Sequence, residues 1–130
     1  MTDAMTLRID LDSAVPAYRQ IVDGLRILLV GGKLVPGSEL PSVRRVAVDL
    51  GVHFNTVAEA YRTLAGEGWI DLRHGRGATV LRRDAPTVNA EKVTEFRQRL
   101  RALVAEMQSQ GASAAKLSVE LRQLAGELEV

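Results

Sequence analysis

Five polar side chains suited to contacts with nucleic acid lie close together in the sequence: Arg44, Arg45, His53, Asn55 and Thr56. A guanidinium group forks onto a phosphate or onto O6 and N7 of guanine, and an Asn amide pairs with N6 and N7 of adenine. A Thr side chain contacts a phosphate or a thymine methyl, and a His ring offers one more donor. These residue types at this spacing indicate contacts with the bases and phosphates of a DNA duplex.

A second basic set follows at Arg73, His74, Gly75 and Arg76. Glycine lets the backbone come close to a duplex, so we interpret this set as the tip of a hairpin in or over the minor groove. The whole chain carries 17 Lys and Arg against 16 Asp and Glu, a formal net charge of +1. Because the positive charge is local, we expect modest non-specific DNA affinity with a visible salt dependence.

The elements that must position these side chains are a helix, a tight glycine turn and a second helix. Ser42 is a good N-cap for a helix over 43–50, and Gly51 ends that helix. A further helix is expected from about 54 to 67, followed by the basic hairpin as a wing. The second helix of such a unit lies in the major groove with its N-terminal side chains at base edges, so residues 53–56 are the predicted reading positions.

The rest of the N-terminal part has a simpler pattern. Leu7–Leu11 alternates apolar and polar residues, which predicts a short half-buried strand or, alternatively, a frayed arm. A helix is expected from Pro16 to about residue 30, and residues 33–40 are expected to form a turn. Val57, Tyr61 and Trp69 are expected in the core, with Trp69 at the junction between the third helix and the wing.

The C-terminal part carries an apolar seam typical of helices that pack on another helix. Its members are Phe96, Leu100, Leu103, Met107, Leu117, Leu121 and Leu124. Gln110 and Gly111 interrupt the pattern, and Ser113 is a good cap for the final helix. One interpretation is that both helices fold back on the winged domain. We favour a homodimer because exposed apolar stripes mark partner surfaces.

Together these elements predict a mostly α fold with a small β-wing. A winged helix-turn-helix domain with an N-terminal strand or arm is expected over residues 1–83, and a two-helix dimerisation segment over residues 84–130. Two-fold symmetry would place two reading helices on one duplex. The predicted operator is therefore an inverted repeat with half-sites about one turn, roughly 10 bp, or a multiple apart.

Other chemistry has little support in this sequence. The chain has no Cys and only two His, so a metal site is not expected, and no cofactor motif is present. There is no nucleophile paired with a base, no phosphate loop and no carboxylate pair at a useful spacing, which argues against an enzyme. No apolar run has the length of a signal peptide or a membrane span, so we expect no membrane partner and a cytoplasmic location.

The ordered motifs resemble the DNA-binding domain of GntR-type transcription regulators over roughly residues 14–81. They are Pro16-Ala17-Tyr18-Arg19-Gln20-Ile21, Leu40-Pro41-Ser42-Val43-Arg44, Gly51-Val52, Asn55-Thr56-Val57, Ala60-Tyr61, Leu64, Glu67-Gly68 and Gly75-Arg76-Gly77. The short C-terminal part is similar to the YtrA branch of that family, in which two helices dimerise. The resemblance implies a DNA-binding regulator that acts as a homodimeric repressor, and a small-molecule effector of unidentified structure.

The resemblance also carries DNA contacts onto particular residues, namely Arg44, His53, Asn55, Thr56, His74 and Gly75. Three residues depart from the family pattern: Phe54 replaces a frequent Arg or Pro, and Ala58 and Glu59 replace frequent basic residues. Phe54 either meets thymine methyls or packs.

Other interpretations of the site remain open. Asn55 and Thr56 could form a displaced helix cap, since Asn is a stronger N-cap than His. Arg44 and Arg45 could be a solvated helix face. A second hypothesis for the whole chain is a winged-helix module that docks a partner protein through its C-terminal helices.

Overall fold

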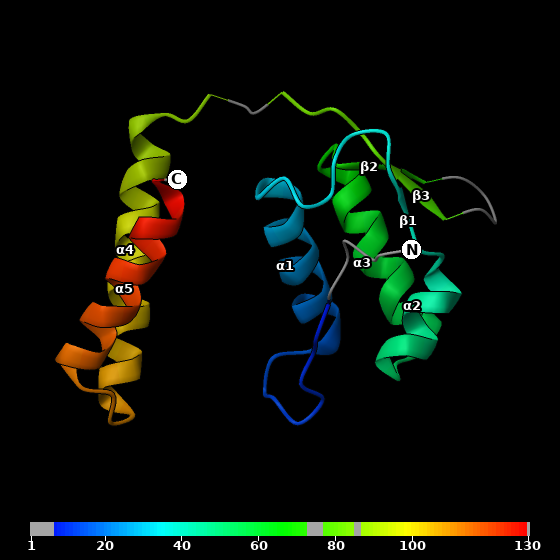
Figure 1. Cartoon of the computed structure of the whole chain (residues 1–130). Helices are drawn as coiled ribbons and strands as arrows, with labels where there is room; N and C mark the ends of the chain where they lie inside the picture. The colour runs from blue at the N-terminus through cyan, green and yellow to red at the C-terminus, as the bar shows by residue number, and fades with distance from the viewer. Residues whose placement is uncertain (1–6, 73–76, 85–86, 130) are drawn as a thin grey trace. The chain divides into compact units, whose positions relative to one another are not determined.

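The structure is a computed structural model, and it describes residues 7–72, 77–84 and 87–129. The chain divides into two compact units, Met1–Asp84 and Ala85–Val130, and each is described here by itself. The first unit contains helices α1 (Ala17–Val30), α2 (Val43–Leu50) and α3 (Phe54–Gly66) and strands β1 (Glu39–Leu40), β2 (Ile70–Leu72) and β3 (Ala78–Val80). The second contains helices α4 (Ala90–Ser109) and α5 (Ala114–Leu128) (Figure 1).

The first unit packs three helices on a small antiparallel sheet with the strand order β1-β3-β2. In β2 and β3 the register pairs Ile70 with Val80 and Leu72 with Ala78, so the two strands form the expected hairpin. The predicted mostly α fold with a β-wing is therefore confirmed.

The core of this unit lies between α1 and α3 and the inner face of the sheet. Helix α3 supplies Val57, Ala60, Tyr61 and Leu64, spaced by three and four residues so that all face one side, and each is fully buried. Tyr61 is in the core as expected. Trp69 is only half-buried and packs against the edge of the core.

The strand expected over residues 7–11 is absent; Leu7–Asp10 form an irregular arm. The Gln20 side chain supplies the hydrogen bonds that a neighbouring strand would provide: its Oε1 accepts from Asp10 N at 2.7 Å and its Nε2 donates to Asp10 O at 2.9 Å. Leu7 and Ile9 pack against the core while Arg8 and Asp10 are exposed. The alternation of apolar and polar residues therefore comes from an extended arm that packs one side against the helices. An extended chain of this kind has the same two-residue period as a half-buried strand.

Strand β1 was not expected, since residues 33–40 were predicted only as a turn. Glu39 pairs with Thr79 and Leu40 with Ala78, and Gly37 N and Val80 N extend the ladder through hydrogen bonds of 2.8 Å. A strand of two residues is too short to show a period, and its partner lies far away in the sequence. Its effect is to attach the wing to the chain just before α2.

The second unit is a pair of helices joined by a short turn. Asn89 caps α4 by accepting from Lys92 N, and Ser113 caps α5 by accepting from Lys116 N, as its residue type predicted. Figure 1 shows the chain reversing direction between α4 and α5. None of the described residues of either helix is buried in the single chain. No helix in the described part of the chain is long and apolar enough to cross a membrane.

Candidate nucleic-acid interface

Local signals fix the turn between α2 and α3. Ser42 Oγ accepts a hydrogen bond from Arg45 N at 3.1 Å and so caps α2. Gly51 ends α2 with φ 72° and ψ 34°, a left-handed conformation that costs a residue with a Cβ about 1 kcal/mol or more. These two residues set where α2 starts and where the chain turns into α3.

A tertiary hydrogen bond then fixes α3 against the start of α2. The buried Tyr61 donates its hydroxyl proton to Pro41 O at 2.7 Å, and burial raises the pKa of this phenol far above its usual value, so it remains a donor. The base of the wing lies close to the start of α2: a Cβ added to Gly77 would be only 3.3 Å from Leu40 O. Gly77 also has a positive φ of +77°, a conformation that favours glycine. One small region therefore holds α2, α3 and the wing together.

His53 is the N-cap of α3. Its Nδ1 accepts a hydrogen bond from Asn55 N at 3.0 Å. The alternative in which Asn55 or Thr56 forms a displaced helix cap is therefore wrong. The His53 ring accepts the capping hydrogen bond through a nitrogen lone pair, although smaller polar side chains are more common at N-caps. His53 and Asn55 are exposed and Thr56 is half-buried, so the cap leaves the Asn55 side chain at the surface.

Arg44 and Phe54 lie next to this cap. The Arg44 guanidinium is 5.9 Å from the centre of the Phe54 ring, and the His53 and Phe54 rings stack at 5.0 Å with an angle of 24° between their planes. The Arg44 side chain thus extends from α2 towards the first turn of α3. The residues predicted from the sequence as base-reading and phosphate-binding, Arg44, His53, Asn55 and Thr56, belong to one continuous region.

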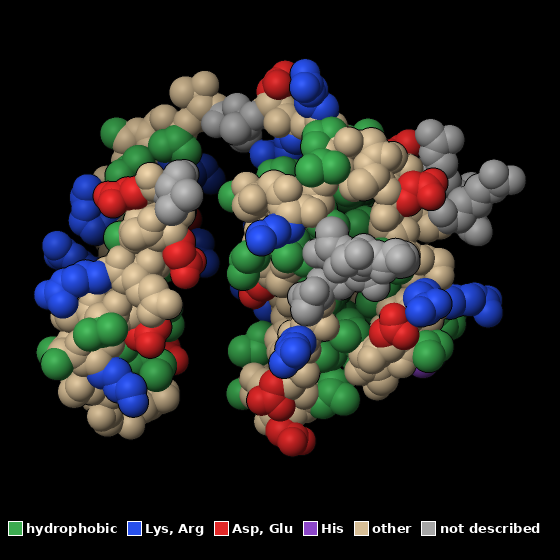
Figure 2. Space-filling view, in the orientation of Figure 1, with side chains coloured by type: hydrophobic (Ala, Val, Ile, Leu, Met, Phe, Trp, Pro, Cys, Tyr) green, Lys and Arg blue, Asp and Glu red, His purple; other side chains and the backbone are tan. Residues whose placement is uncertain are grey.

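Arg45 is oriented differently from Arg44. Its Nε lies 3.2 Å from Oδ2 of Asp49, one turn further along α2, and the two side chains are 72% and 57% exposed. Such a surface ion pair is worth less than about 1 kcal/mol, so a phosphate can replace Asp49 as the partner of Arg45. Figure 2 shows Lys or Arg side chains projecting from the surface formed by α2, beside acidic and apolar side chains.

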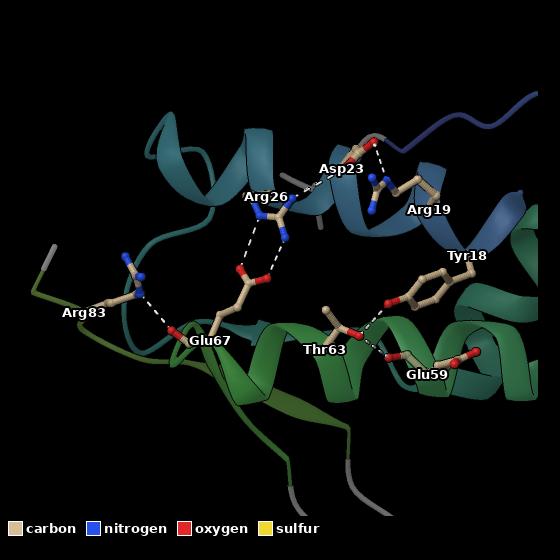
Figure 3. A network of polar contacts seen from close by, with 8 residues as sticks. All are labelled: Tyr18, Arg19, Asp23, Arg26, Glu59, Thr63, Glu67 and Arg83. Atoms are coloured by element: carbon tan, nitrogen blue, oxygen red, sulfur yellow. Dashed lines mark hydrogen bonds and ion pairs between the residues drawn. The ribbon is translucent and has the colours of Figure 1, made fainter. Parts of the chain in front are cut away.

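The far end of α3 is held by a network that the sequence did not reveal (Figure 3). Arg26 of α1 binds Glu67 through two hydrogen bonds, Nη2 to Oε2 at 2.6 Å and Nε to Oε1 at 3.2 Å. These bonds lower the pKa of Glu67 and raise that of Arg26. Arg83 Nε donates to Glu67 O at 2.9 Å, and its guanidinium lies 4.5 Å from the Trp69 ring centre. The network joins α1, the end of α3 and the segment that leaves the wing.

The residues predicted to form the basic wing tip, Arg73, His74, Gly75 and Arg76, lie outside the described residues. The strands that lead to and from them, β2 and β3, are described and form the expected hairpin. Within the described residues, no group of three or more His, Cys, Asp or Glu is arranged to hold a metal ion.

The residues predicted to form a dimer seam are still accessible in the single chain. Phe96 is 64% exposed, Leu103 55% and Leu124 54%, with Met107 and Leu121 also exposed. Leu100 and Leu117 are half-buried.

Comparisons with known proteins agree with this architecture. Residues 17–80 match the family described as Bacterial regulatory proteins, gntR family. The HTH-type transcriptional repressor YtrA of Bacillus subtilis (strain 168) is 30% identical over 123 residues, which cover 95% of each chain. The chain belongs to the GntR family. The family and the YtrA branch inferred from the sequence motifs are therefore confirmed.

Solved structures support the same assignment over both units. YtrA from Sulfolobus acidocaldarius, a GntR-family transcription factor, is 30% identical with a TM-score of 0.54, covering 95% of this chain and 100% of that one. A transcriptional antiterminator from Listeria monocytogenes EGD-e is 26% identical with a TM-score of 0.69, covering 98% and 92%. As a GntR-family member, the chain is a DNA-binding transcription regulator and not an enzyme.

Proposed function

We propose that this GntR-family protein is a homodimeric repressor that binds an inverted-repeat operator and blocks access to a promoter. The observation that carries the proposal is the surface at the start of α3, where Arg44 lies beside the capped turn that exposes His53 and Asn55. Helix N-termini of this kind enter the major groove in helix-turn-helix proteins. Such a protein meets its operator on chromosomal DNA, so we expect it to act in the cytoplasm.

We assign the contacts by residue type. The Asn55 amide is suited to an adenine and the Arg44 guanidinium to a guanine. Thr56 is suited to a phosphate or a thymine methyl, and Arg45 to a phosphate or a guanine. His53 offers its Nε2 proton outward because Nδ1 is occupied by the cap. In the wing, Arg73, His74, Gly75 and Arg76 are assigned to the minor groove or its phosphates.

The proposed dimer is formed by the two-helix segment, residues 84–130, which contains the second unit. None of its described residues is buried in the single chain, although Phe96, Leu103 and Leu124 are large and apolar. Two short helices bury too little surface to be stable alone, so this face needs cover. A second copy supplies it symmetrically and brings two reading helices to one duplex, with half-sites about one turn, roughly 10 bp, or a multiple apart.

Release from DNA requires a ligand that binds the free protein better than the operator-bound protein, because only differential affinity shifts that equilibrium. We propose a small-molecule effector that acts near α4 and α5.

The test is selection of bound sequences from a random or genomic DNA pool, followed by a gel shift with the selected site. We expect an inverted repeat and retardation that weakens steeply with added salt. No enriched sequence and no retardation at low salt would overturn the proposal and favour the protein-docking alternative. An enriched single half-site with a monomeric protein would overturn its dimeric part.

A further inference from the structure

Phe54 is an apolar ring placed among polar side chains at the proposed reading end of α3. It is the first residue of the helix and is 46% exposed, between His53 and Asn55 in the sequence. Its exposure distinguishes it from the other aromatic residue of this helix, Tyr61, which is fully buried. Packing inside the protein therefore does not account for the ring.

The surroundings of Phe54 hold it in place without covering it. His53 stacks on the ring at 5.0 Å, and His53 is itself fixed because its Nδ1 accepts from Asn55 N. The Arg44 guanidinium lies 5.9 Å from the ring centre, within range of a cation–π attraction. The ring thus has a defined orientation, and the guanidinium is drawn towards the start of α3.

The major groove presents one apolar group to a protein, the 5-methyl of thymine, and all its other recognition features are hydrogen-bond donors and acceptors. An exposed, oriented phenyl ring next to base-reading side chains fits that methyl group and no other base edge. We propose that Phe54 determines specificity by contacting a thymine methyl in each half-site and by positioning Arg44 for its own contact. This inference rests on the proposed function, because it requires the start of α3 to lie in the groove.

The first experiment leaves the protein unchanged. Each thymine of the selected operator is replaced in turn by deoxyuridine, which removes only the methyl group, and affinity is measured by titration. Burying one methyl is worth about a threefold to fourfold change in affinity. Substitution at the contacted position in both half-sites should therefore weaken binding about tenfold.

The second experiment repeats the titration with variants. Phe54→Ala should bind the thymine operator more weakly and lose its preference for thymine over deoxyuridine at that position. Phe54→Leu keeps an apolar side chain but no π-face, so it should retain part of the methyl preference. Repeating the selection with Phe54→Leu should also show a weaker preference at the base that Arg44 reads. Ile27→Ala is the control, since Ile27 is exposed on α1 beside Arg26, which binds the opposite end of α3.

The outcomes separate this inference from the proposed function. Binding by the wild-type protein that no deoxyuridine substitution changes would overturn the role of Phe54 while leaving the repressor intact. A methyl preference that survives in Phe54→Ala would assign the contact to another side chain, such as Thr56. Absence of any operator binding by the wild-type protein would instead overturn the proposed function itself.

Discussion

His53 performs a structural task with one ring nitrogen and leaves the other at the surface. Nδ1 accepts the hydrogen bond from Asn55 N, so the neutral ring carries its proton on Nε2. The same ring stacks on Phe54. A single side chain therefore sets the start of α3, orients its aromatic neighbour and presents a donor.

The two tasks of His53 are separable by substitution. His53→Ala removes the cap and should lower the free energy of unfolding by about 1 kcal/mol, whereas His53→Asn keeps a capping side chain and should lower it by much less. Both should weaken operator binding, because both remove the imidazole donor. Urea denaturation and gel-shift titration measure the two effects. Equal destabilisation by Ala and Asn would contradict the capping role.

Arg44 and Arg45 make a matched pair on adjacent positions of α2. Arg44→Ala should weaken operator binding by about 1 to 3 kcal/mol without unfolding the protein, because its guanidinium lies at the start of α3. Arg45→Ala should have a smaller effect, since Asp49 already engages that guanidinium. Affinity of each variant is measured on the selected operator. An Arg44→Ala protein with unchanged affinity would remove that residue from the interface.

At the scale of elements, the second half of α3 is fastened by contacts with different partners. Tyr61 binds Pro41 O near the start of α2, and the Glu67 carboxylate binds Arg26 of α1. Between them, the Tyr18 hydroxyl lies 2.8 Å from Thr63 Oγ1. These bonds hold the helix at fixed points, so its exposed first turn has a fixed position relative to α2.

Two Tyr→Phe substitutions test which fastening matters for DNA binding. Each removes one partly buried hydrogen bond and should cost about 1 kcal/mol of stability. Tyr61→Phe should also weaken operator binding, because it frees α3 from the start of α2. Tyr18→Phe should leave binding nearly unchanged, because it affects only the contact between α1 and α3. Equal losses of affinity would show that general stability, and not the geometry of α2 and α3, governs binding.

The Arg26–Glu67 pair predicts a pH dependence of stability. The hydrogen bond from Arg26 lowers the pKa of Glu67 below its ordinary value of 4.5. The contribution of the ion pair to the free energy of unfolding is therefore fully present above pH 4.5. The contribution is lost as the pH falls through the lower, folded-state pKa, while Arg26 stays charged throughout. Both side chains are about one-third exposed, so solvent screening keeps the effect below about 1 kcal/mol.

Comparison with Glu67→Gln measures this contribution. The Gln variant keeps the backbone carbonyl that accepts from Arg83 but has no charge. Urea midpoints at about pH 7 should be lower for Glu67→Gln than for the wild type, and the two should converge towards about pH 3. A difference that grows as the pH falls would be the wrong sign for this pair.

The sequence predicted the helices that are set by signals between neighbouring residues. It did not predict the features that depend on contacts between residues far apart in the chain. Ser42 and Gly51 each act on neighbours within a few positions, and the bounds expected for α2, 43–50, agree with the structure. Strand β1 pairs with residues about forty positions later, and Arg26 reaches Glu67 over 41 positions. No short-range pattern encodes such pairs. The displaced cap was wrong for a different reason, since cap preferences rank residue types without regard to ring geometry.

At the scale of the molecule, the two units differ in how they are stabilised. Among its described residues, the first has a buried core of fifteen apolar residues, which come from its helices and strands except for Leu34 in the loop before β1. The second has no buried residue among those described, and we expect its apolar side chains to be covered by a second copy. We therefore expect the first unit to keep its fold when the second is disturbed.

Leu103→Glu tests the proposed covering by a second copy. Leu103 is 55% exposed in the single chain, so Glu is tolerated in a monomer but would be buried without a partner charge in a dimer. The variant should sediment as a monomer and bind the operator far more weakly, because two half-sites are no longer engaged by one molecule. Gln98→Glu is the control, since it adds the same charge to α4 outside the seam and should leave the dimer intact. If Leu103→Glu still sediments as a dimer, the seam through Phe96, Leu103 and Leu124 is not the interface, and another face must bring the two reading helices together.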